Sequence, residues 1–139
     1  MTNNLVDQQI DVKIKLAALW VAHFLIWSFG DILRFLSPEF LGELPISNEE
    51  LLFIAPIGIL QAIMIVVSVI LKGKPNRYAN LILGVLYFGI DIAYLTDNIL
   101  NQYPAWEILL TVVYIAFDAM IIWFAYKWHK VNGQISSSS

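Results

Sequence analysis

The segment ANLILGVLYFGIDIAYLTDNIL, Ala79–Leu100, decides the fold of this chain. At 1.5 Å per residue it is long enough to cross the hydrocarbon core of a bilayer, about 30 Å thick, as an α-helix. Asp91 lies well inside the segment, and a carboxylate at that depth costs about 2.5 to 3.5 kcal/mol on insertion scales. Lipid offers such a group no partner, so Ala79–Leu100 predicts a helix packed in a bundle with a polar interior.

Three further segments share this length and character, namely Leu16–Leu36, Leu51–Leu71 and Ala105–Tyr126. The composition agrees, because 59% of the 139 residues are hydrophobic and only 14% are charged, with a mean hydropathy of +0.70. A soluble domain of this size could not bury so much apolar surface. We therefore predict an all-α integral membrane four-helix bundle, a single transmembrane domain over residues 1–139, whose first span is retained and not cleaved as a signal peptide.

Several residues mark the ends of these spans. Ser47 and Glu50 form an S-x-x-E capping box before the second span, and Gly73 follows that span as its expected C-cap. Pro104 stands where the fourth helix would begin, a position that proline favours. Pro56 lies inside the second span, where its missing N–H permits a kink that would widen the outer half of the bundle.

The basic residues lie on one side of the predicted membrane. They precede the first span, occupy the loop between the second and third, and follow the fourth, whereas the other two loops contain no Lys or Arg. The positive-inside rule therefore predicts that both termini are cytoplasmic. The net charge of -3 gives no sign of a nucleic-acid partner, and we expect none. The basic residues that fix this orientation are Lys13, Lys15, Lys72, Lys74, Arg77, Lys127 and Lys130.

A rotation of 100° per residue gathers the polar side chains of each span on one face. Counting 1.5 Å per residue places Asp118 and Gln61 near the bilayer midplane and His23 alone in the cytoplasmic half. The remaining polar groups line a path that opens outward, which predicts an outward-facing acidic pocket. The candidate ligand-binding residues are His23, Asp31, Arg34, Gln61, Tyr87, Asp91, Tyr94, Tyr114 and Asp118.

Asp31 and Arg34 lie three residues apart on one helix face, and two interpretations stay open for them. They form an ion pair near the outer interface, or Arg34 contacts an anion or a substrate. The first interpretation predicts that removal of either residue leaves an uncompensated charge in the membrane.

Asp91 and Asp118 have no charged partner on their own helices. Two carboxylates within reach of one another in a low-dielectric interior do not both ionise near neutral pH, so we expect them to share a proton and to titrate together. Two interpretations remain open here as well. Hydrogen bonds from Gln61, Tyr87 or Tyr114 satisfy the carboxylates, or the pair binds a cation, an amine or a proton.

His23 is the one histidine inside a predicted span. A lone histidine on a polar helix face is more often a hydrogen-bonded core residue than a metal ligand. The chain has no cysteine, so thiolate ligands and thiol chemistry are excluded. The sequence also contains no phosphate-binding loop or nucleophile elbow. We therefore expect no bound metal and no cofactor.

Two short stretches indicate an internal duplication. Phe29–Ile32 reads FGDI on the first span, and Phe88–Ile92 reads FGIDI on the third. Two repeated helical hairpins, related by an axis along the membrane normal, would bring the aspartate-bearing faces of these spans to a shared centre.

Four stretches resemble a family of small four-helix bacterial inner-membrane proteins of unknown function, which are loosely similar to DoxX-like proteins. The resemblance covers nearly the whole chain and implies a multi-pass protein of the bacterial cytoplasmic membrane. It implies no activity and assigns no role to any residue. The stretches are KIKLAALW (Lys13–Trp20), GDILRFLSPEFL (Gly30–Leu41), NRYAN (Asn76–Asn80) and IIWFAYKWH (Ile121–His129).

Three functional interpretations stay open. The first is binding or transport of a small amphiphilic or cationic ligand, or of protons, through the acidic pocket. The second is an accessory protein whose polar core is structural and whose small-residue pairs, Gly89 with Ala93 and Ala18 with Ala22, pack against a second copy or a larger membrane protein. The third is a small intramembrane isomerase or hydrolase with an aspartate as acid or base, which the sequence favours least. In each case the lipid bilayer is a partner.

The predicted orientation can be tested by cysteine labelling. In separate variants, Pro45→Cys lies in an expected outer loop and Pro75→Cys lies in the basic loop. An impermeant thiol reagent added outside intact cells should label the first variant and not the second. Labelling of the second alone would reverse the orientation.

Overall fold

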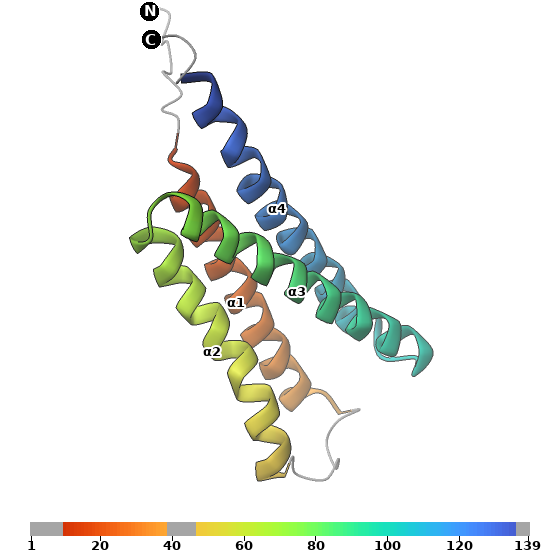
Figure 1. Cartoon of the computed structure of the whole chain (residues 1–139). Helices are drawn as coiled ribbons and strands as arrows, with labels where there is room; N and C mark the ends of the chain where they lie inside the picture. The colour runs from red at the N-terminus through yellow and green to blue at the C-terminus, as the bar shows by residue number, and fades with distance from the viewer. Residues whose placement is uncertain (1–9, 39–46, 136–139) are drawn as a thin grey trace, which may run out of the picture.

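The computed structural model describes residues 10–38 and 47–135, and the side chains as far as Trp128. This part of the chain forms four α-helices: α1 (Val12–Leu36), α2 (Asn48–Ile70), α3 (Gly73–Leu100) and α4 (Ala105–Ile135). Each helix is long and apolar enough to cross a membrane. They pack as a bundle (Figure 1). The predicted all-α, four-span membrane bundle is confirmed.

The helix ends agree with most of the predicted boundary residues. The Ser47 hydroxyl accepts a hydrogen bond from the Glu50 backbone N–H at 3.2 Å, and Glu50 in turn accepts from the Ser47 N–H at 2.8 Å, so the capping box is formed. Pro104 directly precedes α4, and its carbonyl accepts from the backbone N–H of Glu107 at 3.0 Å. α2 continues through Pro56 without a break in the helix.

The predicted C-cap at Gly73 is wrong. α2 ends with Leu71 as its C-cap, and Gly73 is the first residue of α3, with a φ of +63°. Glycine adopts this left-handed conformation without a steric penalty, so it allows the chain to turn sharply between two helices. α3 therefore begins earlier than the predicted span at Ala79, and the basic loop is reduced to a tight turn.

The bundle consists of two helical hairpins that meet along one side. α1 packs along α2, α3 packs along α4, and α1 also packs along α4. α2 and α3 touch little, and Figure 1 shows them diverging from their shared turn. If the two hairpins were related by symmetry, α1 would pack against α4 as extensively as α2 packs against α3. The two hairpins exist, but their packing is unequal.

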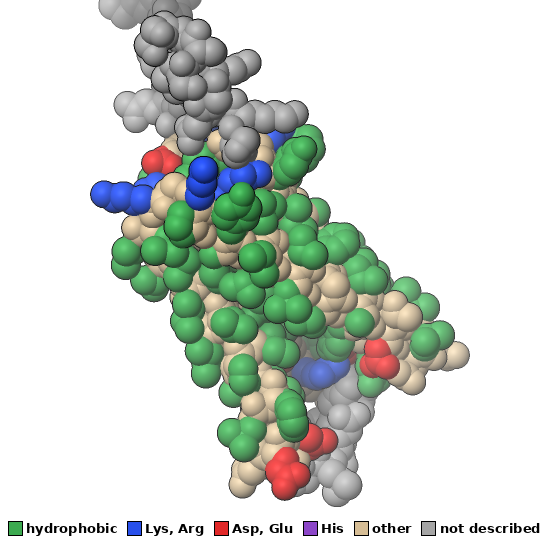
Figure 2. Space-filling view, in the orientation of Figure 1, with side chains coloured by type: hydrophobic (Ala, Val, Ile, Leu, Met, Phe, Trp, Pro, Cys, Tyr) green, Lys and Arg blue, Asp and Glu red, His purple; other side chains and the backbone are tan. Residues whose placement is uncertain are grey.

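The outer surface of the bundle is apolar, as lipid contact requires. The side chains of Phe35 and Phe53 are 81% and 82% exposed, and Gly89 and Ala93 also lie on the exposed face of α3. Figure 2 shows hydrophobic side chains over the middle of the visible face, with most Lys and Arg at the end that carries the α2–α3 turn. A soluble protein of this size would not expose so continuous an apolar surface. The chain is a multi-pass membrane protein.

A buried polar network joins α1, α2 and α3 near the turn. The Trp20 indole N–H donates to the side-chain oxygen of Asn80 at 2.7 Å, and the Ser68 hydroxyl donates to the same oxygen at 3.0 Å. The Asn80 amide donates to Asn76, whose own amide donates to backbone carbonyls at the end of α2. All four side chains are fully buried. The network fixes one end of the bundle, because lipid offers these groups no alternative partner.

This network generates a stability prediction. Asn80→Ala removes the shared acceptor of Trp20 and Ser68, and should lower the free energy of unfolding in mixed micelles by about 1 to 3 kcal/mol, since each interhelical bond in a membrane contributes about 0.6 to 2 kcal/mol. Asn101→Ala is the matched control, because Asn101 is exposed and bonds only within its own helix end. Equal effects of the two changes would show that the network does not hold the helices together.

Candidate cation site inside the helix bundle

Three ionisable side chains from three helices meet in the interior of the bundle. The Nε2 atom of His23 on α1 lies 3.1 Å from Oδ2 of Asp91 on α3 and 3.5 Å from Oδ1 of Asp118 on α4. One ligand atom from each residue lies within 4.8 Å of the other two. We call these three residues the inner acidic site.

The inner acidic site is almost completely enclosed. His23 and Asp118 are 0% exposed and Asp91 is 4% exposed. Neither carboxylate oxygen of Asp118 has a hydrogen-bond partner among the residues that the structure describes, and neither does Nδ1 of His23. A buried carboxylate without a donor is costly, and native structures contain few of them. When both carboxyl groups are ionised, the site therefore holds negative charge that the described protein groups satisfy only in part.

His23 is not isolated, contrary to the prediction. It was expected alone in the cytoplasmic half, but α1 packs so closely along α4 that its imidazole reaches both aspartates. The prediction failed because depth along a single helix does not report the tilt and offset between neighbouring helices. His23 is consequently the charged or polar partner that Asp91 and Asp118 lacked on their own helices.

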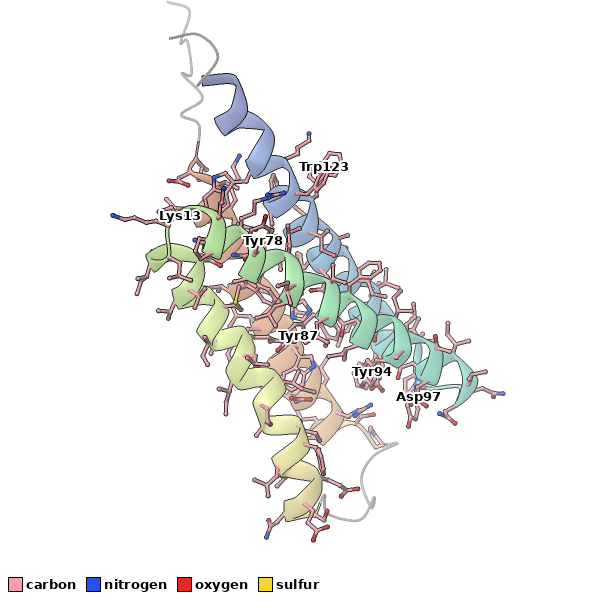
Figure 3. All side chains as sticks on the ribbon, viewed as in Figure 1. Lys13, Tyr78, Tyr87, Tyr94, Asp97 and Trp123 are labelled. Atoms are coloured by element: carbon pink, nitrogen blue, oxygen red, sulfur yellow. The ribbon has the colours of Figure 1, made fainter. Side chains whose placement is uncertain are left out.

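Aromatic rings enclose the inner acidic site. The ring of His23 lies in contact with those of Trp20, Tyr87 and Tyr114, at centroid distances of 6.3, 5.8 and 5.5 Å. Figure 3 shows Tyr87 at the centre of the bundle and Tyr94 further along α3. These rings exclude water and lower the local dielectric constant, which strengthens every electrostatic interaction in the site.

The predicted hydrogen bonds to the aspartates are not made. The Tyr87 hydroxyl donates to the backbone carbonyl of Ile57, and the Tyr114 hydroxyl donates to that of Ile26 at 3.3 Å. Gln61 is fully buried, but its amide has no hydrogen-bond partner in the described part of the chain. The tyrosines thus bind α2 and α1 and leave the carboxylates to His23.

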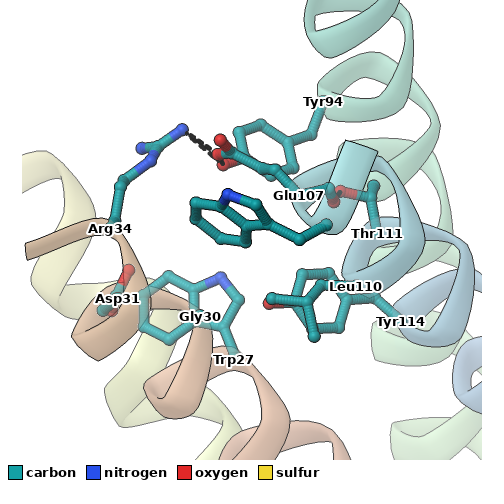
Figure 4. Close-up of a pocket in the computed structure, with 10 residues that line it drawn as sticks. Trp27, Gly30, Asp31, Arg34, Tyr94, Glu107, Leu110, Thr111 and Tyr114 are labelled. Carbon is teal, nitrogen blue, oxygen red and sulfur yellow. Dashed lines mark hydrogen bonds and ion pairs between the residues drawn. The ribbon is translucent and has the colours of Figure 1, made fainter. Parts of the chain in front are cut away.

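A second cluster, here called the outer cluster, lies closer to the ends of the helices that are opposite the α2–α3 turn. Arg34 on α1 forms an ion pair with Glu107 on α4 and donates to the Tyr94 hydroxyl at 2.6 Å (Figure 4). Tyr94 itself donates to Glu107, and the Thr111 hydroxyl donates to the Glu107 backbone carbonyl at 2.8 Å. This cluster joins α1, α3 and α4 on the side of the inner acidic site that faces away from the α2–α3 turn.

The predicted ion pair between Asp31 and Arg34 is wrong. Among the described residues the guanidinium group pairs with the carboxylate of Glu107, which is buried on the facing helix. Asp31 is exposed, and it remains close enough to Arg34 for a weaker electrostatic attraction. Arg34 is attracted more strongly to a buried carboxylate than to an exposed one, because water screens the charge of the exposed carboxylate.

The outer cluster borders an open pocket, here called the outer pocket, with an empty volume of about 280 Å³ that includes space open to solvent. Gly30 lets the Tyr114 hydroxyl lie close to α1, because a Cβ atom at position 30 would be only 2.6 Å from that hydroxyl. The Tyr114 side chain both lines the pocket and contacts the His23 ring. One aromatic side chain thus lies between the pocket and the inner acidic site. The pocket is lined by Trp27, Gly30, Asp31, Arg34, Tyr94, Trp106, Glu107, Leu110, Thr111 and Tyr114.

The structure places eight of the nine predicted site residues in one of two places. His23, Asp91 and Asp118 form the inner acidic site with Tyr87 at its wall, whereas Asp31, Arg34, Tyr94 and Tyr114 line the outer pocket. Gln61 is buried on α2, and its side-chain amide makes no hydrogen bond to either place. Sequence reasoning did not include Glu107, Trp27 or Trp106 in the site. Glu107 was visible on the polar face of the fourth span, but nothing in the sequence showed that it faces Arg34.

Comparison with protein-family models, with curated proteins and with solved structures finds no match to this chain. The resemblance to DoxX-like membrane proteins therefore stays a prediction. The chemistry of the inner acidic site must be inferred from its own geometry. Two carboxylates beside one imidazole, in an enclosed aromatic space, suit a small positively charged ligand.

The ion pair in the outer cluster can be tested by a double-mutant cycle. Arg34→Leu and Glu107→Gln should each destabilise the protein in mixed micelles, and the double variant should be less destabilised than their sum by roughly 0.5 to 3 kcal/mol. The parallel cycle with Asp31→Asn should be additive within roughly 0.5 kcal/mol. Strong coupling in the Asp31 cycle and none in the Glu107 cycle would contradict the observed pairing.

Proposed function

We propose that this protein binds a small cation inside the membrane at His23, Asp91 and Asp118. The observation that carries the proposal is the environment of the Asp118 side chain. Its carboxylate is fully buried, it accepts no hydrogen bond from an N–H or hydroxyl group in the described ranges 10–38 and 47–135, and its polar neighbours are the Asp91 carboxyl group and the His23 imidazole. A bound cation would supply the positive charge and the ligand bonds that this carboxylate otherwise lacks.

The charge of the inner acidic site supports this function. Asp91 and Asp118 together contribute two negative charges when ionised, and His23 contributes at most one positive charge. Arg34 does not make up the difference, because Glu107 and Tyr94 hold its guanidinium group in the outer cluster. Uncompensated charge in a membrane interior costs several kcal/mol, so a cation in the site would be strongly stabilising.

The outer pocket is the proposed route to the site. It is open at the outer side of the bundle, and the exposed Asp31 carboxylate lies at its lining, where it would attract cations. Tyr114 separates the pocket from His23, so passage of a cation requires this side chain to rotate away from Ile26. The 3.3 Å bond that holds its hydroxyl is long, which favours such a movement. Binding, and transport coupled to it, are both compatible with this arrangement.

The two other interpretations fit the geometry less well. A structural core in an accessory protein would be expected to satisfy its buried polar groups, but Asp118 and Gln61 have buried side-chain atoms without partners among the described residues. An isomerase or hydrolase needs a substrate next to its acid or base. The lining of the pocket includes neither Asp91 nor Asp118.

The cellular setting belongs to the same proposal. The four apolar helices support a multi-pass membrane protein. The bacterial cytoplasmic membrane follows from the family resemblance, and cytoplasmic termini follow from the positions of the basic residues. With that orientation the outer pocket opens away from the cytoplasm.

Thermal unfolding in detergent tests the proposed function. We expect that at least one cation from a panel of Na⁺, K⁺, Mn²⁺, Zn²⁺ and a hydrophobic amine raises the unfolding temperature of the wild-type protein in a saturable manner. Binding at 100 times the Kd stabilises the native state by about 2.7 kcal/mol, an effect large enough to measure. The variant Asp91→Asn, Asp118→Asn should lose this response, because it keeps the shape of the site and removes its charge.

Asp97→Asn is the matched control, since Asp97 is an exposed carboxylate on the same helix as Asp91. It should respond to cations as the wild type does. If no cation in the panel stabilises the wild type, or if the double variant responds equally, the inner acidic site is not a cation site and the accessory interpretation becomes the better account.

A further inference from the structure

We infer that the cation bound at His23, Asp91 and Asp118 is a divalent transition metal. This inference rests on the proposed function and names the class of its ligand. It departs from the sequence analysis, which expected no metal because a lone histidine in a span is more often a hydrogen-bonded core residue than a ligand and because the chain has no cysteine. Three observations carry it: the spacing of the ligand atoms, the kinds of donor atom, and the balance of charge.

The spacing of the ligand atoms suits a small ion. Zinc binds imidazole nitrogen and carboxylate oxygen at about 2.0 to 2.2 Å, so ligand atoms around a tetrahedral ion lie about 3.4 Å apart. Nε2 of His23 lies 3.1 Å from Oδ2 of Asp91 and 3.5 Å from Oδ1 of Asp118, and the three ligand atoms are all within 4.8 Å of one another. Small rotations of the two carboxylates would bring all three atoms into bonding positions.

The donor atoms select a class of metal. One imidazole nitrogen with two carboxylate oxygens suits Zn²⁺, Mn²⁺, Fe²⁺ or Co²⁺, whereas Ca²⁺ and Mg²⁺ prefer six or more oxygen ligands and Cu⁺ prefers sulfur. The chain contains no cysteine that could compete as a ligand. A purely electrostatic site for any cation would not need the imidazole.

Asp118 makes the site more than a cluster of acidic groups. Its side chain is 0% exposed, and Oδ1 lies within 3.5 Å of the imidazole nitrogen without a hydrogen bond from any described residue. This oxygen is therefore directed at the other two ligands and remains able to bind an ion. A bound metal ion would give this carboxylate the partner that it lacks in the membrane interior.

The charges of the site also balance with a divalent ion. Metal binding requires a neutral imidazole and ionised carboxylates. Two carboxylates and a divalent cation then sum to zero, which is the least costly arrangement in a low-dielectric interior. A monovalent cation would leave one negative charge without compensation.

The surroundings indicate an exchangeable ion. Structural zinc sites use four protein ligands, but this site supplies three and leaves a position open. In addition, Nδ1 of His23 has no acceptor among the described groups, although a partner on that nitrogen normally strengthens metal binding 10- to 100-fold. We therefore expect a metal that enters and leaves, as the route past Tyr114 would allow.

Metal binding by the purified full-length protein in detergent tests the inference. We expect one Zn²⁺, or one Co²⁺ with its visible absorption bands, per chain after dialysis against buffered metal, measured by elemental analysis and absorption spectroscopy. The discriminating variant is His23→Gln, which keeps both carboxylates and should weaken metal binding by at least about tenfold. Asp97→Asn again serves as the control and should bind as the wild type does.

The outcomes separate this inference from the proposed function. If organic or monovalent cations stabilise the protein through Asp91 and Asp118 but no metal binds stoichiometrically, the cation site stands and the metal inference is wrong. Unchanged metal affinity in His23→Gln would also overturn the inference, since it would place the metal elsewhere. If neither metals nor other cations bind in an aspartate-dependent manner, both proposals fail.

Discussion

The burial of two carboxylates beside one imidazole is the constraint on which the rest of this structure depends. Asp91 and Asp118 lie in the interior of a membrane bundle, where lipid cannot solvate them and where water has little access. Helices that carry such groups must face one another, so the polar faces of α1, α3 and α4 are directed inward and their apolar faces outward. The same constraint thereby brings two carboxyl groups and one imidazole together at the centre of the bundle.

Two polar clusters hold this interior in place from either side. At the end that carries the α2–α3 turn, Asn80 joins α1, α2 and α3 through Trp20 and Ser68. At the opposite end of the bundle, Arg34 and Glu107 join α1 to α4. Side-chain bonds join the helices in both clusters, whereas neither carboxylate oxygen of Asp118, which lies between them, has a hydrogen-bond partner among the described residues. The interhelical side-chain bonds are thus made on both sides of the centre, and the centre keeps a carboxylate without a hydrogen-bond partner among the described residues.

Much of the fold follows from the sequence, because membrane helices are specified by length, hydropathy and local boundary signals. The capping box at Ser47 and the proline before α4 were recognised correctly for this reason. The site was predicted only in part, since helical rotation identifies which residues of one span face inward but not which residues of two spans meet. Arg34 was therefore paired with its neighbour Asp31 instead of Glu107, and His23 was separated from its two aspartates. Those contacts depend on how neighbouring helices are tilted and offset relative to one another, and the sequence of a single span does not determine this.

The central claim is that a cation completes the coordination of Asp118, and an experimental density map of the bundle interior tests it most directly. The protein should be crystallised, or imaged in lipid nanodiscs, in the presence of Mn²⁺. The account predicts a single density feature bonded to His23 Nε2, Asp91 and Asp118, and in crystals it should carry the anomalous signal of manganese. A map in which both oxygens of Asp118 accept hydrogen bonds from protein groups such as Gln61, with no density between the three side chains, would contradict it.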